Sequence, residues 1–211
     1  MQNIGAYGVE LSEMIIGVEV FDLVNNETRY FDREACQFGY RTSHFKVYQA
    51  GQYFITKVIL ELKRHFQPVL AYSDIARLPK TKTASGQSLR SAVLAIRAGK
   101  LPDYNNTPNA GSFFKNPIVT HKMSQDLSSQ GLRTYSFDGR FKVSAAALIQ
   151  AAGLVGIRSG GVRVSPKHAL VFENVGEATL ADIQDLAARV REAVHTQFGV
   201  QLEMEPQGYA V

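Results

Sequence analysis

The nine residues from Asn109 to Pro117 (NAGSFFKNP) place the tightest constraint on what this chain can fold into. Gly111 lets the backbone bend sharply, and Pro117 stops the segment from continuing as a regular element. Between them stand Ser112, two phenylalanines, a lysine and an amide. A plain turn does not need the aromatic residues, and a plain core strand does not need the polar ones. The stretch predicts a shaped loop that holds the Ser112 hydroxyl beside an apolar wall, and a surface loop with one buried phenylalanine is the alternative.

Length and composition narrow the class of protein. The 211 residues suffice for one large domain or two small ones, and 45% of them are hydrophobic, which allows a sizeable core. A single cysteine, Cys36, excludes an internal disulfide and multi-cysteine metal sites, and the five histidines lack metal-ligand spacing. We therefore expect no metal, and a reducing cytoplasm is the default compartment. The apolar runs are too short to span a bilayer, so membrane insertion is not expected.

The charge of the chain favours anionic partners. Its formal net charge is +4 and its pI is about 9.2, which suits either nucleic acid or the phosphates of a small molecule. The basic residues are scattered along the chain, and no aromatic-basic RNA-binding signature occurs. The sequence therefore predicts a phosphate-bearing small ligand and no nucleic acid.

Hydrophobic periodicity predicts strands first, then a mixture of helices and strands. The expected strands are residues 14–23, 28–31, 53–63, 169–173 and 200–205, and the expected helices are residues 33–36, 88–98, 144–152 and 179–198. Residues 100–111 are expected to form a loop, and Thr179 and Asp182 resemble a helix-capping box. This order predicts an α+β fold with two units, which we place at residues 1–85 and 86–199, followed by a terminal strand in residues 200–211.

Two segments near the N-terminus combine small, aromatic and basic residues. NIGAYG (residues 3–8) lets backbone amides approach a flat or anionic ligand, and a tight turn before a strand is its alternative explanation. FGYRTSHFK (residues 38–46) places Arg41 among aromatic residues, where a guanidinium needs an anion or an aromatic face. An arginine paired with an acid across a strand is the structural alternative there.

Four further positions have both a structural and a functional interpretation. Lys100 closes a predicted helix, where a cation is favourable in any case. His168 precedes a predicted strand, a place where histidines commonly hydrogen-bond at the surface. Glu203 and Glu205 are two residues apart, so in a strand both project from one face, which is either solvated or part of a site.

Taken together, the chain resembles the UDP-N-acetylenolpyruvoylglucosamine reductase family. The matching segments, in family order, are NIGAYGVE (3–10), FGYRTSHFK (38–46), QPVLAY (67–72), KLPD (100–103), NAGSFFKNP (109–117), KHAL (167–170) and QLEME (201–205). The resemblance implies the C-terminal part of a p-cresol-methylhydroxylase-type FAD-binding domain, followed by a smaller α+β substrate-binding domain, and it implies that the terminal strand in residues 200–211 returns to the active site. It also implies an oxidoreductase that converts UDP-N-acetylenolpyruvoylglucosamine to UDP-N-acetylmuramate with NADPH, in peptidoglycan biosynthesis.

The resemblance implies functional roles for a set of residues in this chain. In the family NADPH reduces FAD, and the flavin passes a hydride to C3 of the enolpyruvyl group. Ser112 would then be the general acid that protonates C2, which requires a positioned hydroxyl because a free serine is a poor acid. Arg41 would bind the carboxylate, and Glu205 would help to polarise it. The substrate-binding positions would be Tyr72, Lys100, Asn116 and His168, and the cofactor-binding positions Ile4, Gly5, Tyr7 and Gly8.

The chain departs from the family pattern at two places. It opens at Met1, where the family is already inside its flavin domain, so we interpret it as N-terminally truncated, with an incomplete FAD site. After Glu205 the family usually continues with a hydrophobic and a basic residue, whereas Pro206 and Gln207 stand here. A cytoplasmic, monomeric enzyme is the leading interpretation. A UDP-sugar-binding fragment without a functional FAD site is the alternative, and flavin absorbance of the purified chain would separate the two.

Overall fold

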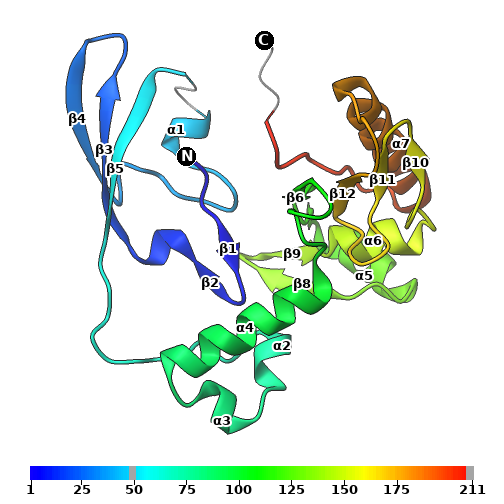
Figure 1. Cartoon of the computed structure of the whole chain (residues 1–211), viewed down its shortest axis with the longest axis horizontal. Helices are drawn as coiled ribbons and strands as arrows, with labels where there is room; N and C mark the ends of the chain where they lie inside the picture. Colours follow the sequence, from blue (N-terminus) through cyan, green and yellow to red (C-terminus); the bar gives the residue numbers. More distant parts are fainter. Residues whose placement is uncertain (48–50, 208–211) are drawn as a thin grey trace. The chain divides into compact units, whose positions relative to one another are not determined.

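The computed structural model describes residues 1–47 and 51–207. The chain forms two compact units, Met1–Ile96 (unit 1) and Arg97–Val211 (unit 2), which Figure 1 colours from blue to green and from green to red. Both units combine antiparallel strands with helices, in agreement with the predicted α+β class. The division lies inside helix α4 (Gly86–Lys100) and so differs from the predicted boundary between residues 85 and 86. The first residue of α4, Gly86, lies beside the ring of Phe66 in unit 1.

Unit 1 is built on a three-stranded antiparallel sheet. Its order is β4-β3-β5, with bounds Glu27–Asp32, Ile15–Asp22 and Tyr53–Leu60, so the three predicted strands are confirmed. The remaining elements are β1 (Gly5–Ala6), β2 (Val9–Glu10), a 3-10 helix (Leu11–Glu13), α1 (His44–Val47), α2 (Ser73–Ala76) and α3 (Lys80–Thr83). One face of β3 packs into a core made of Ile15, Val18, Val20, Phe31, Cys36 and Phe45.

The predicted helix at residues 33–36 is a turn instead. The Asp32 side chain accepts a hydrogen bond from the Ala35 N–H at 2.8 Å, as a helix cap would. The chain cannot propagate a helix, however, because Gln37 already adopts a left-handed φ of 46°. Cys36 in this turn is fully buried, and burial, with a smaller contribution from Asp32, raises the pKa of its thiol to about 11.

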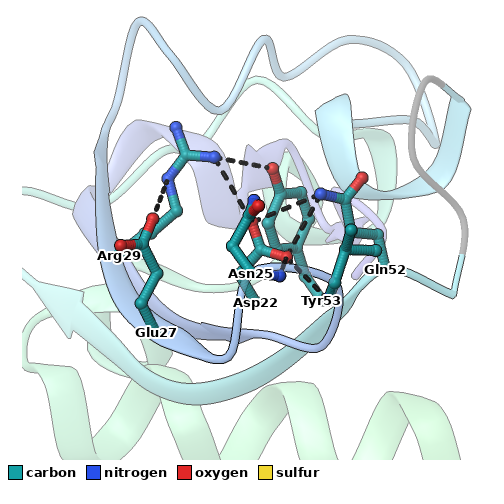
Figure 2. Close-up of polar contacts among 7 residues, drawn as sticks. Asp22, Asn25, Glu27, Arg29, Gln52 and Tyr53 are labelled. Carbon is teal, nitrogen blue, oxygen red and sulfur yellow. Dashed lines mark hydrogen bonds and ion pairs between the residues drawn. The ribbon is translucent and has the colours of Figure 1, made fainter.

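One buried carboxylate, Asp22, organises the turn between β3 and β4 (Figure 2). It accepts hydrogen bonds from the backbone N–H groups of Val24 at 3.0 Å and Asn25 at 3.2 Å. The side chains of Asn25 and Gln52 donate to it at 2.9 and 3.2 Å, and Arg29 lies at 3.4 Å. Burial by itself would raise the pKa of Asp22, but these hydrogen bonds outweigh it and hold the pKa far below its usual range.

We expect the Asp22→Asn variant to unfold at a lower urea concentration at pH 7, because it loses the charge that these donors stabilise. The folded pKa lies below the unfolded value of about 3.9, so the carboxylate stabilises the fold above that pH and the stabilisation is lost as the pH falls further. Urea unfolding at pH 7 and pH 3 should therefore show a larger difference between wild type and variant at pH 7. Glu27→Gln, which removes an exposed carboxylate nearby, is the control. Equal midpoints for wild type and Asp22→Asn at pH 7 would contradict this account.

Unit 2 contains two antiparallel sheets. The first has the order β10-β11-β12-β6, with bounds Arg158–Ser159, Val162–Val164, Val171–Asn174 and Asn109–Ser112. The second has the order β7-β9-β8, with bounds Ile118–Val119, Arg140–Val143 and Thr134–Phe137. Helices α5 (His121–Ser129), α6 (Ala145–Ala151) and α7 (Leu180–Phe198) complete the unit. Helix α7 packs against β10, β11 and α6.

The longest helix, α7, has the predicted ends. Thr179 Oγ1 accepts from the Asp182 N–H at 3.2 Å, and the Asp182 carboxylate accepts from the Thr179 N–H at 2.8 Å, which makes the capping box. Gly199 ends the helix with a left-handed φ of 67°. The apolar stripe is confirmed at its buried residues Leu186, Val190 and Val194, but Leu180 is 59% exposed at the first helical position.

Two predictions about short segments in unit 2 are wrong. The expected loop at residues 100–111 ends inside strand β6, because Asn109 already pairs with Glu173. The expected strand at residues 200–205 is reduced to an isolated bridge between Phe114 and Met204, because its partner segment is short. The expected helix at residues 144–152 is confirmed as α6, with Ser144 as its N-cap and Gly153 in the left-handed conformation.

Candidate active site

A β-bulge presents Ser112. Ser112 pairs with Val171 and Asn109 pairs with Glu173, so β6 carries one residue more than β12 between these two positions. Gly111 absorbs the extra residue with a left-handed φ of 72°, and its N–H donates to the Asn109 side chain at 2.9 Å. Ser112 is exposed immediately after the bulge. The predicted shaped segment is therefore the end of a strand and not a loop.

The two phenylalanines that follow Ser112 anchor it to the core. Phe113 and Phe114 are both buried, and the Phe113 ring stacks on Phe172 with a centroid distance of 4.2 Å and an interplanar angle of 15°. Such aromatic pairs contribute about 0.5–1.5 kcal/mol beyond the area that they bury. The apolar wall predicted beside the serine is thus present, and it holds the Ser112 backbone on a rigid support.

The segment after Ser112 changes partner and pairs with the end of the chain. The Glu205 N–H donates to the Phe113 carbonyl at 2.8 Å, and the Lys115 N–H donates to the Glu203 carbonyl at 2.9 Å. Glu205, which is half-buried, therefore lies opposite the residue next to Ser112. Two residues that are far apart in the sequence meet in this way within unit 2.

His168 lies in the turn that leads into β12. Its Nδ1 accepts a hydrogen bond from the Leu170 N–H at 3.3 Å, which leaves Nε2 as the nitrogen that carries the proton in the neutral ring. Burial, and then the charge of Lys100, lower the pKa of His168. The influence of Lys100 on that pKa shows that the end of α4 and the His168 turn are close together.

Asn116 has a structural contact of its own. Its Oδ1 accepts a hydrogen bond from the Ala145 N–H at 2.9 Å, at the first residue of α6. The first N–H groups of a helix lack partners within the helix, so this bond ties the NAGSFFKNP segment to α6.

In unit 1, Arg41 adopts an unusual backbone conformation. Its φ is 56°, a left-handed value that costs a non-glycine residue about 1–2 kcal/mol. Its guanidinium donates to the Gly5 carbonyl at 2.8 Å and lies 5.1 Å from the centre of the Tyr40 ring. Strained conformations of this kind are found preferentially at functional sites, which makes Arg41 a candidate on structural grounds as well.

The NIGAYG segment forms a tight hairpin. Strands β1 and β2 are joined by Tyr7 and Gly8, which have φ values of 54° and 85°, the pattern of a two-residue turn with a positive φ at both positions. The backbone of this segment is therefore a tight turn before a strand, which is the alternative explanation that the sequence left open. The Tyr7 ring lies 5.2 Å from that of Tyr72, so unit 1 brings a predicted cofactor residue and a predicted substrate residue together.

The predicted site residues are thus divided between the two units. Unit 1 holds Arg41, Tyr72 and the predicted cofactor residues Ile4, Gly5, Tyr7 and Gly8. Unit 2 holds Ser112, Glu205, Lys100, Asn116 and His168.

The chain is similar to known proteins over almost its whole length. The sequence model of "UDP-N-acetylenolpyruvoylglucosamine reductase, C-terminal domain" matches residues 102–209. The chain belongs to this reductase family. Curated reductases from Bdellovibrio bacteriovorus and Cupriavidus pinatubonensis are 41% and 43% identical to it over 210 residues, which cover 98% of this chain and 62% of each relative. The crystal structure of the reductase from Thermus caldophilus matches with a TM-score of 0.61 and 26% identity, over 97% of this chain and 56% of that one.

The chain therefore corresponds to the C-terminal part of such a reductase and spans about 62% of the length of these curated relatives. No helix in residues 1–47 and 51–207 is both long and apolar enough to cross a membrane. In the same residues, no three side chains among His, Cys, Asp and Glu are grouped as a metal site would require.

Sequence reasoning missed several residues that shape the candidate site. Asn109 closes the bulge, and Ser165 accepts hydrogen bonds from the N–H groups of Lys167 and His168 at 3.1 and 3.4 Å, which shapes the His168 turn. A serine two or three residues before a turn is a recognised local signal for such bonds. The ion pairs Lys115–Glu203 and Arg163–Glu173 had no such signal, because each joins residues on different strands or segments.

Proposed function

We propose that this chain is the C-terminal part of an FAD- and NADPH-dependent reductase that converts UDP-N-acetylenolpyruvoylglucosamine to UDP-N-acetylmuramate, for peptidoglycan synthesis in the cytoplasm. The observation that carries the proposal is the pairing of Phe113 with Glu205, which brings the Glu205 segment beside a serine that a bulge exposes. The reaction adds a hydride to C3 and a proton to C2 of the enolpyruvyl group. It therefore needs a positioned proton donor as well as a source of hydride. The protein is proposed to act as a monomer.

Ser112 is the proposed proton donor. The bulge and the stacked phenylalanines fix the backbone at Ser112, so placing its hydroxyl against C2 would require the ordering of little more than one side chain. Arg41 would bind the substrate carboxylate and stabilise the charge that builds on it during hydride addition, and Glu205 would help to polarise that carboxylate. The negative charge builds only as the hydride arrives, so groups that meet this charge would stabilise the transition state more than the substrate.

The nucleotide end of the substrate is proposed to bind through Lys100, Asn116, His168 and Tyr72. Lys100 supplies a positive charge for the diphosphate, and the neutral His168 can donate a hydrogen bond from Nε2 to an oxygen. A diphosphate oxygen beside both residues would also raise the pKa of His168 from its lowered value.

Unit 1 is proposed to be the C-terminal part of a p-cresol-methylhydroxylase-type FAD-binding domain. The β1–β2 hairpin exposes Ile4, which is 58% accessible, together with the small residues Ala6 and Gly8, so a flat ring could approach its backbone closely. On β5, Val58 and Leu60 are exposed and are two residues apart, so they share one face of the strand, as expected for a face that further parts of a larger domain cover. When bound there, FAD would supply the hydride that reaches C3, which it takes from NADPH.

Titration calorimetry with UDP-N-acetylglucosamine on the purified chain tests the division of roles between the two units. Lys100→Ala should weaken binding and remove most of its salt dependence, because the point charge that salt screens is gone. Arg41→Ala should leave binding almost unchanged, since Arg41 is assigned to the enolpyruvyl carboxylate. Arg90→Ala removes an exposed cation from the same helix and serves as the control. If Arg41→Ala weakens binding as much as Lys100→Ala does, the proposed division is incorrect.

A further inference from the structure

We propose that Asn109 is a positioning residue for Ser112: its side-chain amide holds the bulge of β6 in the shape that fixes the backbone at the serine. This inference rests on the proposed function, because it takes Ser112 as the proton donor. Asn109 is assigned no contact with the substrate, so it acts on the reaction only through the serine three residues later.

The Asn109 amide bonds to the backbone on both sides of its own residue. Its Nδ2 donates to the Thr107 carbonyl at 2.8 Å, and its Oδ1 accepts from the Gly111 N–H at 2.9 Å. An asparagine side chain that accepts from the N–H two residues later mimics a backbone turn. The half-buried side chain of Asn109 therefore ties the loop before β6 to the glycine of the bulge.

The bulge leaves Gly111 with little else to fix its conformation. Between the paired residues Asn109 and Ser112, β6 has two residues where β12 has one, and the extra residue of a bulge is unpaired in the ladder. Within the described residues, a Cβ added at Gly111 would meet no atom within 4 Å beyond the adjoining residues, so its surroundings leave room for movement. Glycine adopts positive and negative φ about equally readily. The bond to Asn109 therefore favours the observed φ of 72° over the alternatives.

Other contacts already restrain the chain on the far side of Ser112. The Phe113 N–H donates to the Leu170 carbonyl at 2.7 Å, and the Phe113 ring stacks on Phe172. Asn109 supplies the corresponding restraint on the near side. Without its amide, Gly111 gains conformational freedom and the serine is held at one end only.

The test compares Asn109→Ala with wild type in a full-length, flavin-loaded version of the protein. We expect oxidation of the reduced flavin by the enolpyruvyl substrate to slow about tenfold to a hundredfold, the scale on which a misplaced catalytic group costs rate. Reduction of the flavin by NADPH should keep its rate. Asn109→Ser, which keeps an uncharged acceptor for the Gly111 N–H, should lie between the two. Asn106→Ala removes an exposed amide from the loop before β6 and is the matched control.

Two further measurements distinguish positioning from a general structural role. In a Ser112→Ala background, Asn109→Ala should change the substrate rate by less than about twofold, because the group that it positions is absent. In the purified chain, the Gly111 amide proton should exchange with solvent faster in Asn109→Ala than in wild type, which NMR detects independently of activity.

The outcomes are distinct. Asn109 is only half-buried, so its replacement should not prevent folding. A normal substrate rate in Asn109→Ala, or the same slowing with and without the Ser112 hydroxyl, would overturn the proposal. Unchanged exchange of the Gly111 amide would overturn it as well. If Ser112→Ala by itself leaves the substrate half-reaction at the wild-type rate, it is the proposed function that fails.

Discussion

Replacement of Ser112 by alanine in a full-length version of the protein is expected to slow the reduction of the enolpyruvyl substrate by about a hundredfold or more, the range in which general-acid catalysis contributes. The bulge fixes the Ser112 backbone and leaves the side chain exposed, and under the proposed function the variant lacks the group that protonates C2. Reduction of the flavin by NADPH should keep its rate, because that step does not use the acid. Single-turnover measurements of the two half-reactions would check this.

Two controls sharpen the Ser112 experiment. Ser129→Ala removes an exposed serine hydroxyl from α5 and should change neither half-reaction. Thermal unfolding of Ser112→Ala should resemble that of wild type, since an exposed hydroxyl contributes little to stability. Slower flavin reduction by NADPH in Ser112→Ala would count against the assignment, and so would a normal rate with the substrate.

The second large effect concerns stability. Arg163→Met is expected to lower the free energy of unfolding by about 3–5 kcal/mol, the usual result of leaving a buried carboxylate without its partner. Glu173 lies directly opposite Arg163 across β11 and β12, and its side chain is only 3% exposed. The Arg163 Nε donates to the Glu173 carboxylate at 2.6 Å. Urea unfolding of the wild type and the variant would measure the loss.

The double variant Arg163→Met, Glu173→Leu tests whether the loss of stability comes from the unpaired charge of Glu173 or from the lost packing of Arg163. A buried ion pair that is replaced as a whole by apolar side chains is commonly neutral or stabilising, so the double variant should recover most of the loss. Arg140→Met, at an exposed position of β9, should stay within about 0.5 kcal/mol of wild type. If the double variant is as unstable as Arg163→Met, the unpaired charge is not the cause. Because Glu173 also pairs with Asn109 at the bulge, the single variant should disturb the Ser112 segment too.

The elements that sequence analysis predicted correctly are those with local signals. The capping box of Thr179 and Asp182, the left-handed glycine at residue 199 and the apolar stripe of α7 all lie within a few helical turns. The alternating residues of β3 likewise indicate a strand before any partner is known. The helix at residues 33–36 was wrong although Asp32 makes its cap bond, because the conformation of Gln37 is set by the chain that follows.

The candidate site was also only partly predictable, because part of its geometry depends on segments that are distant in the sequence. The NAGSFFKNP segment indicated a bend at Gly111 and an apolar wall at Phe113 and Phe114, and both are present. The bulge that connects them was not predictable, because a bulge is defined by the register against β12. The short strands β7 to β11 were missed because each has two to four residues, too few to show a period.

By itself the sequence determined the family, the α+β class and the residue types available for chemistry, since these depend on local pattern and on motifs read in order. Only the tertiary structure decided that the Glu205 segment lies against Phe113, that Lys115 takes Glu203 as its partner and that Lys100 influences His168. It also decided that Glu173 is buried with Arg163. The physical reason is that pairing and burial depend on which distant segments meet and in which register. Such non-local contacts form only when the chain folds, so no short stretch of the sequence specifies them.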